Sequence, residues 1–555
     1  MLKTCEITSK QFEITNSDLE FLTKISPTFN GKRFEIPPPT ISPEERMRRR
    51  TAHRNEWSFH HNKSAMSGKP LISIYRPDSG YKVYSHDEWF SDKWDPINYG
   101  QDFNENKSFF EQLHELDKNV PKLTTTAFNN ENCEFTSGTG CCKNCYLINC
   151  SEYDEDCYYG KLIQSSKNCV DCAFIYDCEL MYECFYVRNG YNCKFVYYSQ
   201  NVVDCWFCDD LKNCQNCFLC TNLVGKKYHF FNQALAKEEY EKRVKEFVGS
   251  FQNFESAKKL FNDLRAKRIY KYANIINSEN CTGDFINNCK NCLNSFEMND
   301  SQDCKNIQVG VNIKDCMDCS NMYIKPELSY EVLSTLETYN IHFCLNVYYS
   351  NNMWYCLNCK SCKNCFGCSG LQNQEYCILN KKYSKEEYEK LTAKIITHMQ
   401  KNTEWGEYFP ISMSAIPYNE SVAQDYLPLS KKEIENKNFK YGQEDPFSKH
   451  QGPEYEIPDN IINVKNEITD KILTCQESGK LYKILPAELK FYKQMQVPIP
   501  RLCPNERYRL RLKNRNSFTL YNRTCTKCFK PMQSTYSPNR PEIIYCEECY
   551  LKEII

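Results

Sequence analysis

Between residues 133 and 377, polar and apolar positions follow a short repeat with almost no helical periodicity. The region holds 29 of the 36 cysteines, and Asn or Asp immediately precedes 19 of these 29. Asn-Cys pairs end at Cys145, Cys169 and Cys193, at a constant interval of 24, and other cysteines return at intervals of 12. The pattern predicts two β-solenoid-like stacks of short parallel strands, with polar turn residues outside and cysteines packed inside. We favour a coil of about 24 residues over one of 12 because the longer step keeps the Asn-Cys pairs in register.

The two stacks are related to each other. The sequence from Cys217 to Lys242 matches the sequence from Cys365 to Lys390 at an offset of 148, and each segment ends in Lys-Glu-Glu-Tyr-Glu-Lys. We expect each of these endings to form a helix that caps the open edge of its stack. Apolar residues at helical spacing predict that the first helix continues through Phe261 toward Ile275.

The two ends of the chain are also copies of each other. Pro43, Glu45 and Arg46 match Pro504, Glu506 and Arg507 at an offset of 461, and Cys5 matches Cys475 after a nine-residue insertion. One module is therefore used twice, over residues 5–90 and 475–550.

The C-terminal module contains two Cys-x-x-Cys pairs, the first formed by Cys525 and Cys528 and the second by Cys546 and Cys549. Two tight turns at this spacing present four thiolates tetrahedrally, so we predict one structural zinc ion in a ribbon. The matching N-terminal positions are Ser64, Ser67, Ser85 and Glu88, and serine is a poor zinc ligand. We expect that copy to lack metal; a replacement site of His60, His61, His86 and Glu88 is the alternative.

An arginine series precedes each ribbon. The candidates for nucleic-acid binding are Arg46, Arg48, Arg50, Arg54, Arg507, Arg509, Arg511 and Arg515. Arginine forks suit phosphate oxygens, which indicates nucleic acid or a ribonucleoprotein as a partner, with protein partners also plausible. The competing interpretation, which we favour, is a solvated helix face that forms ion pairs with neighbours such as Glu45 and Glu506.

The predicted fold class is mixed and β-rich, with two cysteine-rich solenoid-like stacks and helical caps between duplicated α+β zinc-ribbon-like modules. The expected domains are an N-terminal module without zinc cysteines (1–100), a linker with a helix (101–132), the first stack (133–235), capping helices (236–278), the second stack (279–382), a capping helix and irregular linker (383–474), and the C-terminal zinc module (475–555).

The composition and charge of the chain indicate its cellular compartment and limit the classes of partner. The net charge of −1 gives no general attraction to nucleic acid or membrane, and no run of about 18 apolar residues is present. The segment from Met1 to Asn30 intersperses charges among apolar positions, unlike a signal peptide. We therefore predict a cytoplasmic protein without a membrane partner, whose thiols are reduced. Most central cysteines are expected to fill the core, and a further metal site near Cys141, Cys142 and Cys145 stays open.

A resemblance supports this organisation over nearly the whole chain. The motifs are Pro43-x-Glu45-Arg46 with Arg54-Asn55, Ser91-Asp92-Lys93-Trp94-Asp95-Pro96, the two Lys-Glu-Glu-Tyr-Glu-Lys helices, and Glu404-Trp405-Gly406-Glu407. They resemble the uncharacterised long cysteine-rich proteins with terminal zinc ribbons found in candidate-phyla-radiation bacteria. The first module of that family usually carries zinc-type cysteines, so the serines at 64, 67 and 85 are a departure.

No catalytic motif is found: the sequence lacks a phosphate-binding glycine loop, His-Glu-x-x-His, a nucleophile elbow and a dinucleotide fingerprint. The predicted function is a non-catalytic zinc-binding scaffold or interaction protein that contacts nucleic acid or a ribonucleoprotein through its arginines. One alternative is a metal or redox reservoir that uses the central cysteines, and another is an unrecognised enzyme.

Overall fold

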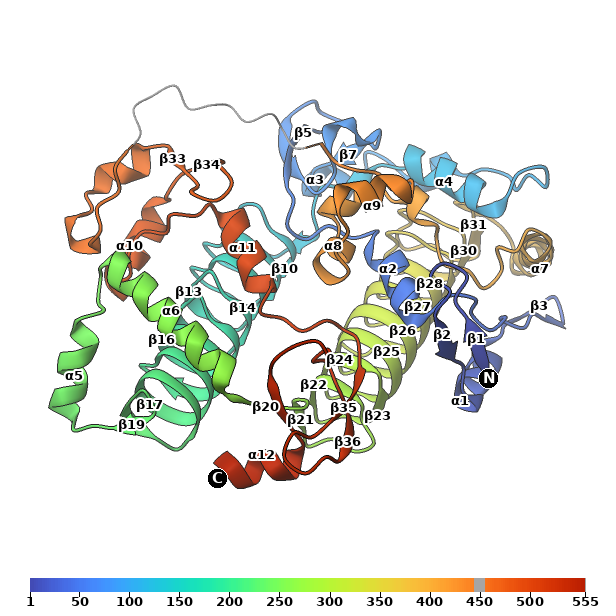
Figure 1. Cartoon of the computed structure of the whole chain (residues 1–555). Coiled ribbons are helices and arrows are strands. Elements are labelled where there is room, and N and C mark those ends of the chain that lie inside the picture. Colours follow the sequence, from blue (N-terminus) through green and yellow to red (C-terminus); the bar gives the residue numbers. More distant parts are fainter. Residues whose placement is uncertain (444–454, 555) are drawn as a thin grey trace.

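Most strands of the protein belong to two large sheets that lie side by side (Figure 1). The computed structural model describes residues 1–443 and 455–554. In the described residues one sheet has 11 strands and the other 12, and nearly all neighbouring strands within them are parallel. The chain is therefore β-rich, as predicted. We call the two sheets the first and second stack.

The first stack follows the sequence order closely. Its strands are β9 (Ala127–Phe128), β10 (Ser137–Gly140), β11 (Tyr146–Glu152), β12 (Tyr158–Gln164), β13 (Lys167–Val170), β14 (Ala173–Tyr176), β15 (Glu179–Tyr182), β16 (Phe185–Val203), β17 (Trp206–Val224), β18 (Lys227–Phe230) and β19 (Gln233–Ala234). The last two pair antiparallel and end the stack.

The second stack repeats this arrangement. Its strands are β21 (Ile275–Ile276), β22 (Gly283–Asn287), β23 (Lys290–Leu293), β24 (Ser295–Asn299), β25 (Gln302–Val311), β26 (Lys314–Tyr323), β27 (Glu327–Leu336), β28 (Tyr339–Tyr348), β29 (Asn351–Trp354), β30 (Lys363–Phe366), β31 (Cys377–Ile378) and β32 (Lys381–Lys382). It also ends in an antiparallel pair, β31 with β32.

The strand register corrects the expected coil length. Tyr146 pairs with Tyr158, and Lys194 pairs with Trp206, so one coil is a step of 12 in the sequence and the preference for 24 was wrong. From Asp156 to Asn222, every third residue has a φ near +50 to +60°. Such a residue turns the chain, so each coil has four corners. The Asn-Cys pairs recur at 24 because the corner residue is Asn in every second coil and Asp156, Leu180 or Asp204 in the coils between, while the backbone repeats in every coil.

The corner geometry explains why Asn and Asp precede the cysteines. Asn168 and Asp171 occupy corners, and Cys169 and Cys172, directly after them, point into the core and are fully buried. Asn and Asp tolerate the left-handed conformation better than other residues with a Cβ, and a small sulfur side chain fits a narrow interior. One residue in three therefore faces inward, in place of the two-residue alternation of an ordinary strand.

The interior thiols form hydrogen bonds with backbone carbonyl groups of the coils. The Sγ of Cys157 donates to the carbonyl of Glu155 at 3.3 Å and approaches that of Ser166, in the next coil, at 3.6 Å. Ile, Val and Met share this interior with the cysteines. All 36 cysteines lie in the described residues, and none forms a disulfide.

Helices follow both stacks, but the first does not run on as expected. The first stack is followed by α5 (Lys237–Lys245) and then by a separate helix, α6 (Phe251–Lys267); the second is followed by α7 (Lys385–Lys401). Gly249 lies between α5 and α6 with φ +78°, a left-handed conformation that interrupts the helix, and a side chain there would also meet the Asn460 side chain. α6 then crosses the side of the first stack (Figure 1), where Phe254 packs on Phe207.

The N-terminal module lies against the second stack (Figure 1). Its elements are β1 (Leu2–Thr4), β2 (Gln11–Glu13), α1 (Asn16–Ile25), β3 (Thr28–Phe29), β4 (Lys32–Arg33), α2 (Pro43–Thr51), β5 (His60–Lys63), β6 (Pro70–Ser73), β7 (Val83–Tyr84) and α3 (His86–Trp89), with a short 3-10 helix at Pro77–Ser79.

The C-terminal module repeats this order. It contains β33 (Leu473–Thr474), β34 (Leu481–Tyr482), α10 (Pro486–Met495), α11 (Pro504–Leu512), β35 (Tyr521–Thr524), β36 (Pro531–Ser534), β37 (Ile543–Tyr545) and α12 (Glu547–Ile554). α11 lies on the first stack, and α12 lies near the beginning of the second (Figure 1).

Short elements connect these parts. They are α4 (Phe109–Asn119), β8 (Lys122–Leu123), β20 (Ile269–Lys271), α8 (Val422–Tyr426) and α9 (Lys431–Asn436), with 3-10 helices at Pro96–Tyr99, Ile411–Met413, Tyr418–Glu420, Ile461–Asn463 and Asn466–Asp470. In the described ranges, no helix is long and apolar enough to cross a membrane.

Candidate metal centre

The four predicted zinc ligands come together from two pieces of the C-terminal module. Cys525 and Cys528 lie in the turn between β35 and β36, Cys546 directly follows β37, and Cys549 is in the first turn of α12. β37 pairs in parallel with β20, which lies between the two stacks. This pairing fixes the position of Cys546, the residue that follows β37.

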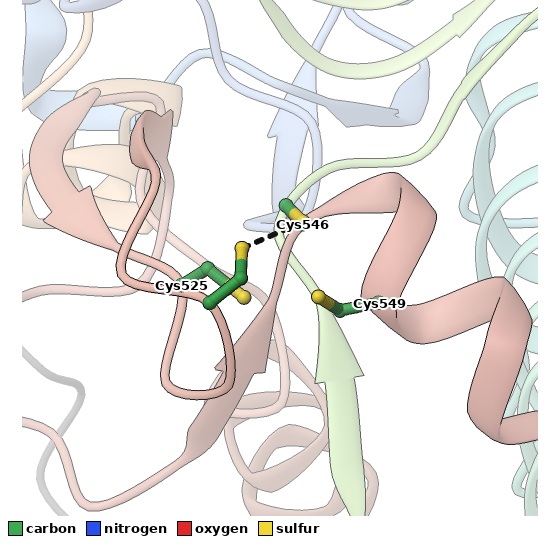
Figure 2. Close-up of side chains that lie close together, drawn as sticks. Cys525, Cys546 and Cys549 are labelled. Atoms are coloured by element: carbon green, nitrogen blue, oxygen red, sulfur yellow. Dashed lines mark hydrogen bonds between the residues drawn. The ribbon is translucent and has the colours of Figure 1, made fainter.

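The sulfur atoms converge on one point. All four Sγ atoms lie within 4.8 Å of one another, and those of Cys528 and Cys546 are 3.7 Å apart. Figure 2 shows the Sγ atoms of Cys525, Cys546 and Cys549 directed toward a common centre. These three cysteines are buried and Cys528 is exposed. The residues can therefore hold a metal ion, and four cysteine thiolates are a preferred ligand set of structural zinc.

The electrostatics of the cluster fit a cation. Burial opposes ionisation of Cys525, but backbone N–H groups, first that of Cys528 and then that of Cys546, lower its pKa to about 6. Burial and the neighbouring thiols, Cys528 first, raise the pKa of Cys549 to about 12. One thiolate is favoured and the others repel it, so a divalent cation at the centre would offset the repulsion.

The turn at Cys525 has a specific backbone pattern. The N–H of Cys525 donates to Lys530 O at 2.9 Å, and the N–H of Phe529 donates to Cys525 O at 2.9 Å. The N–H of Thr526 donates to Ile544 O, also at 2.9 Å, which joins the turn to the strand before Cys546. We call this arrangement the knuckle.

The knuckle occurs four times, twice in each module. The equivalent three hydrogen bonds are present at Cys5, Ser64 and Cys475, with lengths from 2.8 to 3.3 Å. The ligand positions of these knuckles are Cys5, Thr8, Ser42 and Glu45; Ser64, Ser67, Ser85 and Glu88; and Cys475, Ser478, Cys503 and Glu506. The knuckles at Cys5 and Cys475 were missed from sequence. A lysine at the same distance after the first position, at Lys10, Lys69, Lys480 and Lys530, was the available signal.

The knuckle at Ser64 is held by a carboxylate. Glu88 accepts a hydrogen bond from Ser64 Oγ at 2.5 Å and one from the backbone N–H of Ser85 at 2.9 Å. Burial alone would raise the pKa of Glu88, but hydrogen bonds, those from the Ser64 and Ser67 hydroxyls first, lower it to about 2. Glu88 occupies the position that Cys549 has in the C-terminal module, and its carboxylate joins the turn at Ser64 to the segment at Ser85.

The alternative histidine site does not assemble. His60 contacts Glu420 at 3.0 Å and His86 contacts the Thr125 hydroxyl at 3.3 Å, so these rings point to different neighbours. Near the start of the first stack, the thiols of Cys142 and Cys145 point into the core and donate to backbone carbonyls, whereas Cys141 is exposed. Within the described residues, the cluster at Cys525 is the only group with metal-binding geometry.

The arginine series docks the modules on the stacks. In α2, Arg46 pairs with Asp318 at 2.8 Å and Arg50 pairs with Glu331 at 2.7 Å. In α11, Arg507 and Arg511 pair with Asp171 at 2.6 and 2.7 Å. The two aspartates occupy equivalent positions in the two stacks, because Asp171 matches Asp318 at an offset of 147. The offset becomes 148 further along the chain, after one extra residue between β26 and β27.

The positions of the arginines weigh against a nucleic-acid contact, and they also differ from a solvent-exposed helix face. Five of the eight candidate arginines are buried: Arg46, Arg48, Arg50, Arg507 and Arg511. Arg54 pairs with Glu56 at 2.5 Å, and Arg515 lies 4.2 Å from the Tyr426 ring. Arg509 is exposed and pairs with Glu506 at 2.8 Å. Guanidinium groups that are buried against carboxylates cannot also contact phosphates.

Comparison with known proteins adds no assignment. No protein-family model matches the sequence, and no curated protein matches it. A solved structure titled as a candidate acetyltransferase from Desulfovibrio desulfuricans G20 is similar at 10% identity with a TM-score of 0.13. The match covers 44% of this chain and 65% of that one, just under two thirds of its length. A TM-score this low carries no argument, and the resemblance to the candidate-phyla-radiation proteins stays a prediction.

Proposed function

We propose that the protein is a non-catalytic zinc-binding scaffold or interaction protein. The observation that carries the proposal is the convergence of four cysteine Sγ atoms within 4.8 Å, supplied by a knuckle turn and the start of a helix. Cys525, Cys528, Cys546 and Cys549 would hold one zinc ion with all four coordination positions filled by protein. A closed site of this kind stabilises a fold and leaves no position for a substrate.

The proposed zinc-ribbon module would be fixed by the metal at the end of a rigid frame. β-Solenoid-like stacks suit such a frame because each coil pairs with its neighbours and the interior is filled by side chains at every third position. The buried arginine pairs hold both modules against this frame. Thiols that act as ligands must be reduced, so a cytoplasmic location belongs to the proposal.

Two other functions receive less support. A metal or redox reservoir needs accessible or ionised thiols, but the central thiols are buried and donate to backbone carbonyls. Burial raises the pKa of Cys178 to about 12 and disfavours its thiolate. A nucleic-acid contact through the arginine series is not part of the proposal, because the arginines that motivated it are buried in ion pairs.

The test is metal content on anaerobically purified protein, combined with thiol titration before and after denaturation. We expect about one zinc per chain, with most thiols reacting only after unfolding. Several metal ions per chain, or many thiols that react at once in the native protein, would contradict the scaffold and favour a reservoir. Absence of zinc from the folded protein would remove the metal centre.

A further inference from the structure

A cavity of about 590 Å³ lies between the first stack, α6 and the C-terminal module. Its floor is the outer face of the stack, with Tyr182, Phe195 and Tyr197, and the other walls include Arg501 and Leu510. Figure 1 shows α6 crossing the first stack below α11, and the cavity lies along this crossing. None of the four candidate metal ligands lines it.

The second stack closes the equivalent position. There Glu331 is 1% exposed and has three arginine partners: Arg50 at 2.7 Å, Arg46 at 3.5 Å and Arg49 at 3.7 Å. In the first stack the equivalent carboxylate is Glu183, whose one salt bridge within the described residues is to Arg511 at 3.4 Å. The two equivalent carboxylates therefore differ in how completely arginines surround them.

A single replacement accounts for much of the difference. Arg49 matches Leu510 at the offset of 461, so the two residues occupy the same position in α2 and α11. The Arg49 guanidinium reaches across to Glu331 and also pairs with Glu407 at 2.5 Å. Leu510 is shorter, uncharged and 40% exposed at the cavity. An arginine fills and neutralises the position in one copy, and leucine leaves it open in the other.

The cavity surface combines aromatic faces with cations. Arg265 lies 4.7 Å from the Tyr197 ring centroid, Arg501 lies 4.8 Å from that of Phe251, and Lys258 lies 5.5 Å from that of Phe195. Each cation is close enough for a cation–π contact. The cavity wall therefore combines aromatic side chains with positive charge, which suits an aromatic ligand that is negatively charged.

Arg501 supplies positive charge that is only partly compensated, because the nearby Asp459 carboxylate is engaged by Ser250 and the backbone of Gln252. Among the described residues it forms no salt bridge, and its guanidinium donates to the carbonyl of Pro458 at 3.2 Å. Burial lowers its pKa below the ordinary value for arginine. Arg265 differs, because Asp209 lies 2.7 Å away. A half-buried cation that is only partly compensated attracts an anion.

The acidic side chains at the cavity are Glu183, Glu255 and Asp263. Glu255 is engaged with Lys258 at 2.9 Å, and Asp263 is exposed to solvent. Burial raises the pKa of Glu183 to about 7, so this carboxyl is partly protonated at neutral pH. Repulsion of an anion from this side is therefore weak.

We propose that this cavity is a binding site for a small planar aromatic anion. The edges of Tyr182, Phe195 and Tyr197 that line the cavity would contact the ring system, and Arg501 would pair with the negative group. The volume lies within the range of about 300–1,000 Å³ that is typical of small-molecule sites. This site is independent of the metal centre and goes beyond the scaffold function.

The test uses anilinonaphthalene sulfonate, a fluorescent planar aromatic anion, in titrations of the full-length protein. We expect saturable binding at about one site per chain. Leu510→Arg introduces the residue of the other copy, which is expected to pair with Glu183 and to weaken binding about tenfold or more. Arg501→Gln should weaken binding several-fold. N-phenylnaphthylamine, the uncharged analogue of the probe, should bind more weakly than the sulfonate.

Leu260→Arg is the matched control. It makes the same exchange at an exposed leucine of α6 that does not line the cavity, so affinity for the probe should stay within about twofold of wild type. Wild-type affinity in Leu510→Arg, or equal binding of the charged and uncharged probes, would overturn the proposal. If Leu510→Arg does not fold, as judged by near-ultraviolet circular dichroism, Arg501→Gln decides: unchanged affinity overturns the proposal and weakened affinity supports it.

Discussion

The two terminal modules show how one backbone arrangement can be held by two kinds of chemistry. The knuckle at Cys525 gathers four thiols, whereas the knuckle at Ser64 uses the Glu88 carboxylate, which accepts hydrogen bonds from Ser64 and Ser85. The three backbone hydrogen bonds of the knuckle are the same in both. The turn is therefore compatible with either solution, and the metal-ligand set and the hydrogen-bonded carboxylate are alternative ways to join its two halves.

The largest effect should follow removal of one ligand. Cys546→Ser is expected to abolish stoichiometric zinc binding and to unfold the C-terminal ribbon, because binding of structural zinc contributes about 10–16 kcal/mol in small metal domains. Metal analysis and limited proteolysis would measure both effects. Cys503→Ser is the control, since this cysteine is buried in the neighbouring knuckle and should leave the zinc content unchanged. Retention of full zinc by Cys546→Ser would contradict the assignment.

The next largest effect should follow loss of a buried arginine that holds a terminal module against its stack. Arg46→Met leaves the buried Asp318 without its main partner and should lower the free energy of unfolding by about 3–5 kcal/mol. Arg507→Met leaves the buried Asp171 with Arg511 as its remaining partner, so its cost should be no larger than this. Arg509→Met changes an exposed pair and should cost less than about 1 kcal/mol. Chemical denaturation measures the three values. If all three were equally small, the buried pairs would not be what holds the modules.

Restoring thiols to the N-terminal knuckle would test whether its backbone still accepts metal. The quadruple variant Ser64→Cys, Ser67→Cys, Ser85→Cys and Glu88→Cys should raise the zinc content by about one ion per chain. At free zinc about 100-fold above its dissociation constant, binding would add about 2.7 kcal/mol to stability. The same four positions changed to Ala serve as the metal-free comparison. An unchanged zinc content would show that the two knuckles differ in more than their ligands.

The smallest effect is expected at Glu88. Its pKa falls from about 4.5 to about 2 on folding, so the carboxylate contributes stability that is present above about pH 4.5 and is lost as the pH falls toward 2. Glu88→Gln should cost about 1–2 kcal/mol at pH 7 by weakening these hydrogen bonds, with no change in zinc content. When thermal unfolding is measured from pH 7 to pH 3, the melting temperature should fall less in the variant than in wild type. Parallel pH profiles for the two proteins would contradict this role of Glu88.

The coil length shows where inference from sequence failed. The spacing of Cys145, Cys169 and Cys193 was seen, but it reflects alternation of the corner residue before the interior position, which is Asn only in every second coil. The true register depends on backbone pairing, such as that of Tyr146 with Tyr158, which residue types alone do not specify. The break at Gly249 was missed although the signal is local: a glycine in the left-handed conformation is followed by Ser250, which caps the N-terminus of α6.

The sequence by itself determined the four cysteines that can hold a metal ion, the internal duplications and the β-rich character of the central region. These features depend on local spacing: two Cys-x-x-Cys pairs define two turns, and Asn or Asp before cysteine supplies a left-handed corner. The tertiary structure decided the role of the arginines and the presence of the cavity beside Leu510. Asp171 and Asp318 become partners of arginines in the distant terminal modules only after the stacks have formed, and long-range contacts of this kind leave no periodic signal in the chain.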